Sequence, residues 1–143
     1  MGKIISYKDL DVWQQTRLLV KSVYELTSKF PKEEQFGLTN QSRRAAVSVT
    51  SNVAEGCGRN HFKDSTQFFF IARASLYELE TQLIVAGDLE YITEKEVEEI
   101  INHVTRSKKL LNGFINYFQK QSNNSQPTTI NEILEEYGSI SKD

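Results

Sequence analysis

The segment Ser42–Gly58, SRRAAVSVTSNVAEGCG, is dominated by small side chains. Ten of its seventeen residues are glycine, alanine, serine, threonine or cysteine, so its intrinsic helix propensity is modest. Small side chains are useful where another backbone comes close. We therefore expect a helix from about Thr39 to Glu55 inside a helical assembly. Gly56 and Gly58 suit its C-cap, where a positive φ carries no steric penalty for glycine.

The residues on either side of this segment carry helical patterns. Upstream, residues 9–30 repeat apolar or small side chains at spacings of three and four, and Pro31 ends the pattern. Downstream, a third helix is predicted to begin between Asn60 and Ser65 and to end at Ala86, with a capping box formed by Asp64 and Gln67. The core positions of these two helices are Val12, Thr16, Leu19, Val23, Leu26 and Phe30, then Phe69, Ala72, Leu76, Leu79, Leu83 and Ala86.

A fourth helix has the clearest start, because Thr93 is followed three residues later by Glu96. Its apolar positions run from Val97 to Phe118. Four long helices with short joins predict an all-α protein, an antiparallel up-down-up-down four-helix bundle over residues 1–121. Residues 122–143 are expected to form a polar linker and a tail. Within that tail, Thr129 and Glu132 could cap a short docking helix.

Composition limits the class of protein. The 143 residues are 38% hydrophobic and 25% charged, which suits one ordinary globular domain. No apolar run approaches the roughly 18 residues that cross a bilayer, and the first residues lack the features of a signal peptide. We expect a cytoplasmic protein without a membrane partner. The net charge is −2, but residues 1–60 carry nine basic against six acidic residues, so the sequence is compatible with a local basic surface.

Motifs for catalysis and metal binding are missing from the sequence. A di-iron bundle needs Glu-x-x-His pairs, and Glu99 with His103 has the wrong spacing. Cys57 and His61 are four residues apart, but the glycines around Cys57 argue against a shared helical turn. We therefore expect no enzyme activity, no catalytic residue, no metal site and no cofactor.

Three groups of residues are candidates for other roles. The turn from Gly56 to Asn60 fits either a helix C-cap or a cradle of backbone N–H groups for a phosphate, with charge from Arg59 and Lys63. Polar residues near interior faces should pair in a buried network that fixes helix register; these are Arg44, Asn52, Glu55, Arg73 and Glu78. The consecutive residues Phe68, Phe69 and Phe70 sweep about 200° of a helix, so Phe68, Phe70 and the nearby Phe62 are expected at a subunit interface.

Three stretches together resemble a known family. They are YKDLDVW at 7–13, RRAAVSVTSNVAEGCGR at 43–59 and ARASLYELETQL at 72–83. The chain is similar, over residues 7–118, to small bacterial four-helix-bundle proteins first noticed in intervening sequences of 23S ribosomal RNA genes. It departs from the family pattern at Thr50 and Ala74, where members often have proline and glycine.

The resemblance implies a homo-oligomer in the form of a five-fold ring. It also implies a relationship to the accessory protein of diversity-generating retroelements, which binds nucleic acid and a reverse transcriptase. Two hypotheses follow. The protein is either an accessory factor that binds RNA or DNA, or an adaptor whose ring binds a protein partner without nucleic acid. The candidate nucleic-acid contacts are Arg17, Arg43, Arg44, Arg59 and Lys63.

Overall fold

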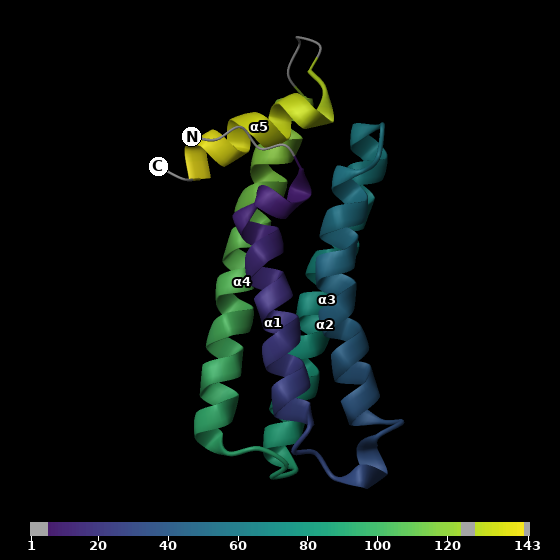
Figure 1. Cartoon of the computed structure of the whole chain (residues 1–143), viewed down its shortest axis with the longest axis vertical. Coiled ribbons are helices and arrows are strands. Elements are labelled where there is room, and N and C mark those ends of the chain that lie inside the picture. The colour runs from purple at the N-terminus through teal and green to yellow at the C-terminus, as the bar shows by residue number, and fades with distance from the viewer. Residues whose placement is uncertain (1–5, 124–127, 142–143) are drawn as a thin grey trace.

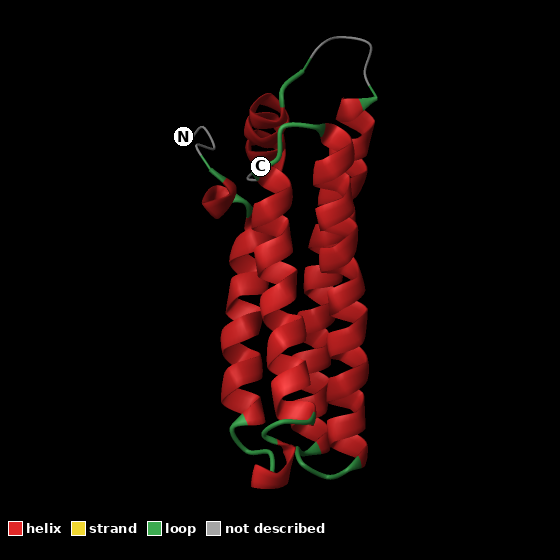
Figure 2. Cartoon of the chain, turned by 90° about the vertical axis from the view of Figure 1, so that its right-hand side faces the viewer, coloured by secondary structure: helices red, strands yellow, loops and turns green. Residues whose placement is uncertain are grey.

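The computed structural model describes residues 6–123 and 128–141, and the regular structure in these ranges is entirely helical. The long helices are α1 (Asp11–Thr27), α2 (Leu38–Cys57), α3 (Phe62–Asp88) and α4 (Glu94–Ser122). They run alternately up and down, and the α1–α2 and α3–α4 connections lie together at one end (Figures 1 and 2). The expected all-α antiparallel four-helix bundle is therefore confirmed.

Shorter elements complete the chain. Two 3-10 turns, η1 (Tyr7–Asp9) and η2 (Lys32–Glu34), precede α1 and α2. A fifth helix, α5 (Ile130–Ser141), lies across the end of the bundle opposite the α1–α2 connection (Figure 1). The expected short C-terminal helix is present, and the Glu132 N–H donates to Thr129 Oγ1 at 3.1 Å, as its sequence suggested.

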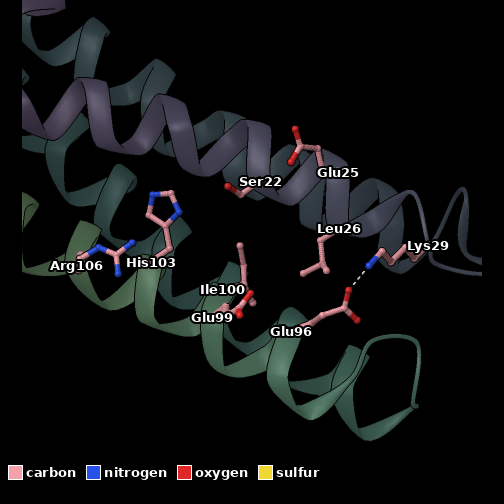
Figure 3. Close-up of a pocket in the computed structure, with 9 residues that line it drawn as sticks. All are labelled: Ser22, Glu25, Leu26, Lys29, Glu96, Glu99, Ile100, His103 and Arg106. Carbon is pink, nitrogen blue, oxygen red and sulfur yellow. Dashed lines mark hydrogen bonds and ion pairs between the residues drawn. The ribbon is translucent and has the colours of Figure 1, made fainter.

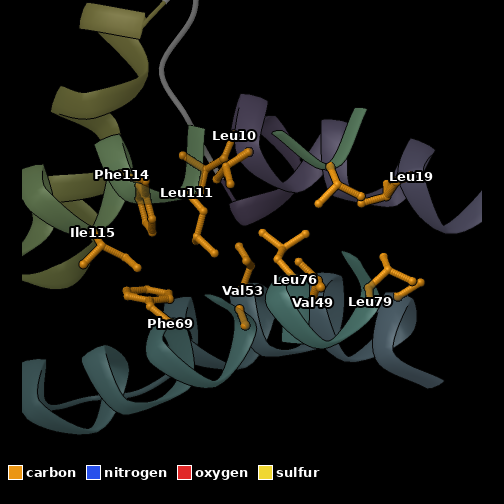
Figure 4. Close-up of a cluster of buried hydrophobic side chains, with 14 of the residues drawn as sticks. Leu10, Leu19, Val49, Val53, Phe69, Leu76, Leu79, Leu111, Phe114 and Ile115 are labelled. Atoms are coloured by element: carbon orange, nitrogen blue, oxygen red, sulfur yellow. The ribbon is translucent and has the colours of Figure 1, made fainter. Parts of the chain in front are cut away.

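The helices enclose a main hydrophobic core, and Phe30, Ala86 and Ile92 form a second, smaller cluster. Phe69 of α3 meets Phe114 and Phe118 of α4 edge to face, with ring centroids 4.9 and 5.1 Å apart. Figure 4 shows Phe69 pointing toward Phe114 and Ile115, with leucine and valine side chains of the other helices filling the space beside them. The α2 and α3 helices pack most extensively on each other, whereas α1 and α4 meet over the smallest area of the neighbouring pairs.

Gly56 explains the close approach of α2 to α3. A Cβ atom at this position would lie 2.3 Å from Phe69 Cε1. Gly56 is thus inside α2, and Gly58 is its C-cap with a φ of −90°. The expected positive φ is wrong for both, because the described part of the chain has no glycine with positive φ. At position 56, glycine is needed because a Cβ atom would overlap the Phe69 ring, and not because the backbone is left-handed.

Two helix starts differ in how well the sequence predicted them. At α4 the capping box is confirmed: Glu96 N–H donates to Thr93 Oγ1 at 3.1 Å, and Thr93 N–H donates to Glu96 Oε1 at 2.9 Å. At α3 the Asp64–Gln67 capping box is wrong. The helix begins at Phe62, within the predicted range from Asn60 to Ser65, and its N-cap is His61. Phe62 packs edge to face on Phe118 with centroids 5.7 Å apart.

Candidate nucleic-acid interface

Two parallel rows of residues form one side of the bundle where α1 lies beside α2. On α1 the row has spacings of four, four and three, which places its members on one helix face; they are Trp13, Arg17, Lys21 and Tyr24. On α2 the spacings are four, three and four, and the members are Arg43, Val47, Thr50 and Ala54. We call these eight residues the α1–α2 face.

Hydrogen bonds join the two rows. Thr50 Oγ1 donates to Thr16 Oγ1 at 2.7 Å, and Arg43 Nε donates to Thr27 Oγ1 at 2.8 Å. Arg43 Nη2 also donates to the Tyr24 carbonyl at 3.3 Å. The hydroxyls of Thr16 and Thr27, which accept the first two of these bonds, donate their own protons to the α1 carbonyls of Val12 and Val23. The rows are therefore held in a fixed register.

Aromatic rings lie under the two arginines of this face. The guanidinium carbon of Arg17 lies 5.4 Å from the Trp13 ring centroid, and that of Arg43 lies 4.6 Å from the Tyr24 centroid. Arg17 and Lys21 are exposed and Arg43 is half-buried. Cation–π contacts of this kind restrict a guanidinium while leaving its charge unneutralised.

The α1–α2 face is positive without a compensating carboxylate. None of its eight residues is acidic, and Arg17, Lys21 and Arg43 form no ion pair within residues 6–123 and 128–141. The acidic residues of α1, Asp11 and Glu25, line grooves beside α4 instead. The face can therefore attract an anionic polymer although the whole chain is slightly acidic.

The five predicted cations do not gather on one patch. Arg17 and Arg43 share the α1–α2 face, and the exposed Arg44 lies at its edge, about 100° around α2 from Arg43. Arg59 and Lys63 lie past the other end of α2; sixteen residues separate Arg43 from Arg59, which is about 24 Å along a helix axis. Sequence reasoning missed Lys21, although its spacing of four from Arg17 is a usable signal.

The turn after α2 forms a helix cap, as one of the two interpretations of the sequence predicted. Gly58 N–H donates to the carbonyls of Ala54 and Glu55 at 3.1 Å, and Arg59 N–H donates to Gly56 O at 3.4 Å. These backbone donors are already used. The Arg59 guanidinium carbon lies 4.4 Å over the Phe68 ring, so this arginine covers an aromatic side chain.

The predicted buried polar network is wrong for the single chain, because Arg44, Glu55 and Glu78 are exposed. The polar groups near them bond locally. Asn52 Nδ2 donates to Ser48 O at 2.8 Å, and Gln82 Nε2 donates to Glu78 Oε1 at 3.1 Å. Arg73 Nη1 donates to Asn112 Oδ1 of α4 at 3.3 Å. The small residues of α2 allow its close packing on α3, and the charged side chains of Arg44, Glu55 and Glu78 lie outside this contact.

The predicted interface phenylalanines are half-buried in the chain itself. Phe62 and Phe70 pack against the core, and Phe68 lies under Arg59. Other apolar side chains of α3 point outward, a feature that the sequence pattern did not single out. The exposed fractions are 47% for Ile71, 52% for Tyr77, 46% for Ile84 and 39% for Val85.

A groove of about 420 Å³ runs between α1 and α4. Figure 3 shows the residues that line it: Ser22, Glu25 and Leu26 of α1, Lys29 just after α1, and Glu96, Glu99, Ile100, His103 and Arg106 of α4. Lys29 pairs with Glu96, and His103 Nε2 donates to the Gln15 carbonyl at 3.3 Å. Burial is the main cause that lowers the pKa of His103, and the nearby Arg106 charge lowers it further. Mixed charges make this groove a poor site for a polyanion.

Cys57 lacks the surroundings of a reactive thiol. It is buried, and burial raises the pKa of its thiol to about 12, so the thiolate is scarce at neutral pH. His61 is exposed at the start of α3. Across residues 6–123 and 128–141, no group of three or more His, Cys, Asp or Glu side chains could hold a metal ion. No helix in these ranges is long and apolar enough to span a membrane.

Comparisons with known proteins agree with the bundle. No curated protein matches the chain. A solved structure from Bacteroides thetaiotaomicron, described as a protein with unknown function from the S23 ribosomal protein family, is 25% identical and superposes with a TM-score of 0.68. The match covers 73% of this chain and 97% of that one. The family profile of 23S rRNA-intervening sequence proteins matches residues 8–113. The chain therefore belongs to the family of 23S rRNA-intervening sequence proteins.

Proposed function

We propose that the protein is a non-enzymatic, cytoplasmic accessory factor that binds RNA or DNA as a homo-oligomer. The observation that carries the proposal is the α1–α2 face, where three cations stand without a carboxylate among them. Phosphate contacts supply most of the affinity of sequence-independent nucleic-acid binding, and they require cations of this kind.

The distribution of charge on the rest of the bundle supports nucleic-acid binding at the α1–α2 face. The first turns of α4 carry Glu94, Glu96, Glu98 and Glu99, and α4 adjoins α1 on the side away from the α1–α2 face. These carboxylates repel a polyanion from that side. A five-fold ring, which the family resemblance suggests, would repeat the basic face in every subunit and strengthen the local field.

The test is a salt titration of binding by fluorescence anisotropy with labelled oligonucleotides. Each phosphate that is neutralised contributes about 0.7 to 0.9 to the slope of log affinity against log salt concentration. Replacing Arg17→Glu together with Lys21→Glu should weaken binding to all sequences and reduce that slope by roughly 1 to 2. The matched control is Lys95→Glu with Lys120→Glu, two exposed lysines of α4, which should leave both quantities nearly unchanged.

A second candidate function rests on the outward apolar side chains of α3. Ile71, Tyr77, Ile84 and Val85 give this helix a surface that a protein partner, such as a reverse transcriptase, could cover. If the folded oligomer shows no nucleic-acid binding even at low salt, the accessory-factor proposal fails and this adaptor role replaces it.

A further inference from the structure

We propose that the α1–α2 face selects single-stranded over double-stranded nucleic acid, with unpaired bases stacking on the guanidinium groups of Arg17 and Arg43. This inference rests on the proposed function and names the class of ligand that the same face takes. It comes from the geometry of the two arginines and from the width of the helix pair that carries them.

Each guanidinium is held in place from below. The Arg17 group lies over the Trp13 indole, whose position is fixed by Tyr7, edge to face with a centroid distance of 5.3 Å. The Arg43 group lies over Tyr24 and is held further by its two hydrogen bonds to α1. A planar cation that is ordered before binding offers its outer side to a base at a reduced entropic cost.

The spacing of these groups suits a strand that follows α1. Seven residues separate Arg17 from Tyr24, the ring under Arg43, which is about 10 Å along the helix axis. Lys21 lies between them, one turn from Arg17 and nearly one turn from Tyr24. Along α1, the guanidinium of Arg17 is therefore followed by the ammonium group of Lys21 and then by the guanidinium of Arg43, which lies over Tyr24. Two stacked bases with a phosphate contact between them match this order.

Double-stranded nucleic acid fits this surface poorly. The faces of paired bases are covered by their neighbours, so a duplex offers a protein its base edges, grooves and phosphates. The DNA major groove is about 12 Å wide and admits one helix, whereas α1 and α2 packed side by side span about 20 Å. A duplex could touch only the charges of this face, and the two stacking platforms would contribute nothing.

The experiment compares a single-stranded oligonucleotide of about 20 residues, as DNA and as RNA, with its duplex at one low salt concentration. Affinity is measured by anisotropy of the labelled strand. Trp13 is the only tryptophan of the chain and lies under Arg17, so its fluorescence reports stacking directly. We expect single strands to bind at least about fivefold more tightly than the duplex and to quench Trp13, while the duplex does not quench it.

The decisive variant is Arg17→Lys, which keeps the positive charge and removes the planar guanidinium group. Arg17 makes no hydrogen bond within the described residues, so this change should leave the fold intact, as a melting curve would check. We expect single-strand affinity to fall at least about fivefold, with the salt slope and duplex affinity unchanged. Arg44→Lys is the matched control, because Arg44 is an exposed arginine of the same region with no aromatic ring under it, and it should have little effect.

Two results would overturn the inference in different ways. Equal affinity for single strands and duplex, with Arg17→Lys behaving like wild type, refutes base stacking and leaves the proposed nucleic-acid function standing. Absence of binding to any of these oligonucleotides at low salt refutes the proposed function and this inference together.

Discussion

Gly56 is the residue at which the bundle depends most clearly on a missing side chain. A methyl group there would overlap Phe69, which is fully buried against Phe114 and Phe118. Gly56→Ala should therefore lower the free energy of unfolding by about 1–3 kcal/mol through overpacking. Gly113→Ala is the control, since an added Cβ meets nothing within 4 Å, and it should stabilise α4 by about 0.5–1 kcal/mol. Urea denaturation measures both, and equal effects would contradict the packing argument.

His103 should make stability depend on pH. Its pKa is lowered below the ordinary value of 6.5, mainly by burial against α1. Below pH 6.5 the unfolded chain therefore binds a proton that the folded chain resists, and the free energy of unfolding falls as pH decreases through the window below 6.5. Glu25, Glu99 and Arg106 also line this groove and can affect stability. The contribution of His103 is therefore isolated by comparing the wild type with a variant that lacks this histidine.

The variant for this test is His103→Gln, which should remove the slope of stability against pH between about pH 6.5 and the lower pKa of the folded state. Urea denaturation at several pH values measures the slope. An unchanged slope in the variant would show that other groups cause the effect.

At the scale of the helix, α5 is joined to the bundle by a small apolar contact. Ile133 is fully buried, and Tyr137 packs edge to face on Phe114 with centroids 5.2 Å apart. Ile133→Ala should weaken docking by at least about 2 kcal/mol and raise amide hydrogen exchange in α5 while the four long helices keep their protection. Ile140→Ala, at a side chain 55% exposed on the same helix, should change neither. Faster exchange throughout the bundle would show instead that α5 unfolds together with the four long helices.

The helix stripes and the capping box of α4 could be predicted because both are local. The apolar repeat from Val97 to Phe118 and the pairing of Thr93 with Glu96 depend on residues within one helix. The details that went wrong, the place of Gly56 and the capping box of α3, depend on contacts between helices. Gly56 belongs inside α2 because Phe69 comes from α3, and the cap of α3 lies before Asp64 because Phe62 meets Phe118 from α4.

At the scale of the whole molecule, the candidate site was predictable only in part. The sequence identified Arg17 and Arg43 as candidates, but their joining into one face requires knowing that α1 and α2 are neighbours in this register. Arg59 belongs to the same list of cations and lies at the far end of α2, over Phe68. Arg44 and Glu78 appeared interior because small residues lie beside Arg44 and apolar residues beside Glu78 in the sequence, whereas the helix rotation turns both to solvent.

The outer surface of α3 carries exposed apolar side chains, and we expect the subunits of the predicted oligomer to meet there. Ile71 and Val85 are exposed, and their separation of fourteen residues puts them within about 40° of one another around the helix. Exposed apolar side chains on one side of a helix are typical of subunit contacts. Light scattering should give a mass several times 16.4 kDa, and five times that value for a five-fold ring. Ile71→Ser with Val85→Ser should lower this mass without unfolding the chain.

Two comparisons decide which surface carries the oligomer contact. Leu18→Ser, at a side chain 51% exposed on α1, is the control and should leave the mass unchanged. Phe68→Ser and Phe70→Ser act on half-buried rings that support Arg59 and Arg73, so any loss of mass there should come with a lower melting temperature. A wild-type mass of one chain at micromolar concentration would refute assembly altogether. A lower mass for the phenylalanine variants at unchanged melting temperature would move the interface from Ile71 and Val85 to Phe68 and Phe70.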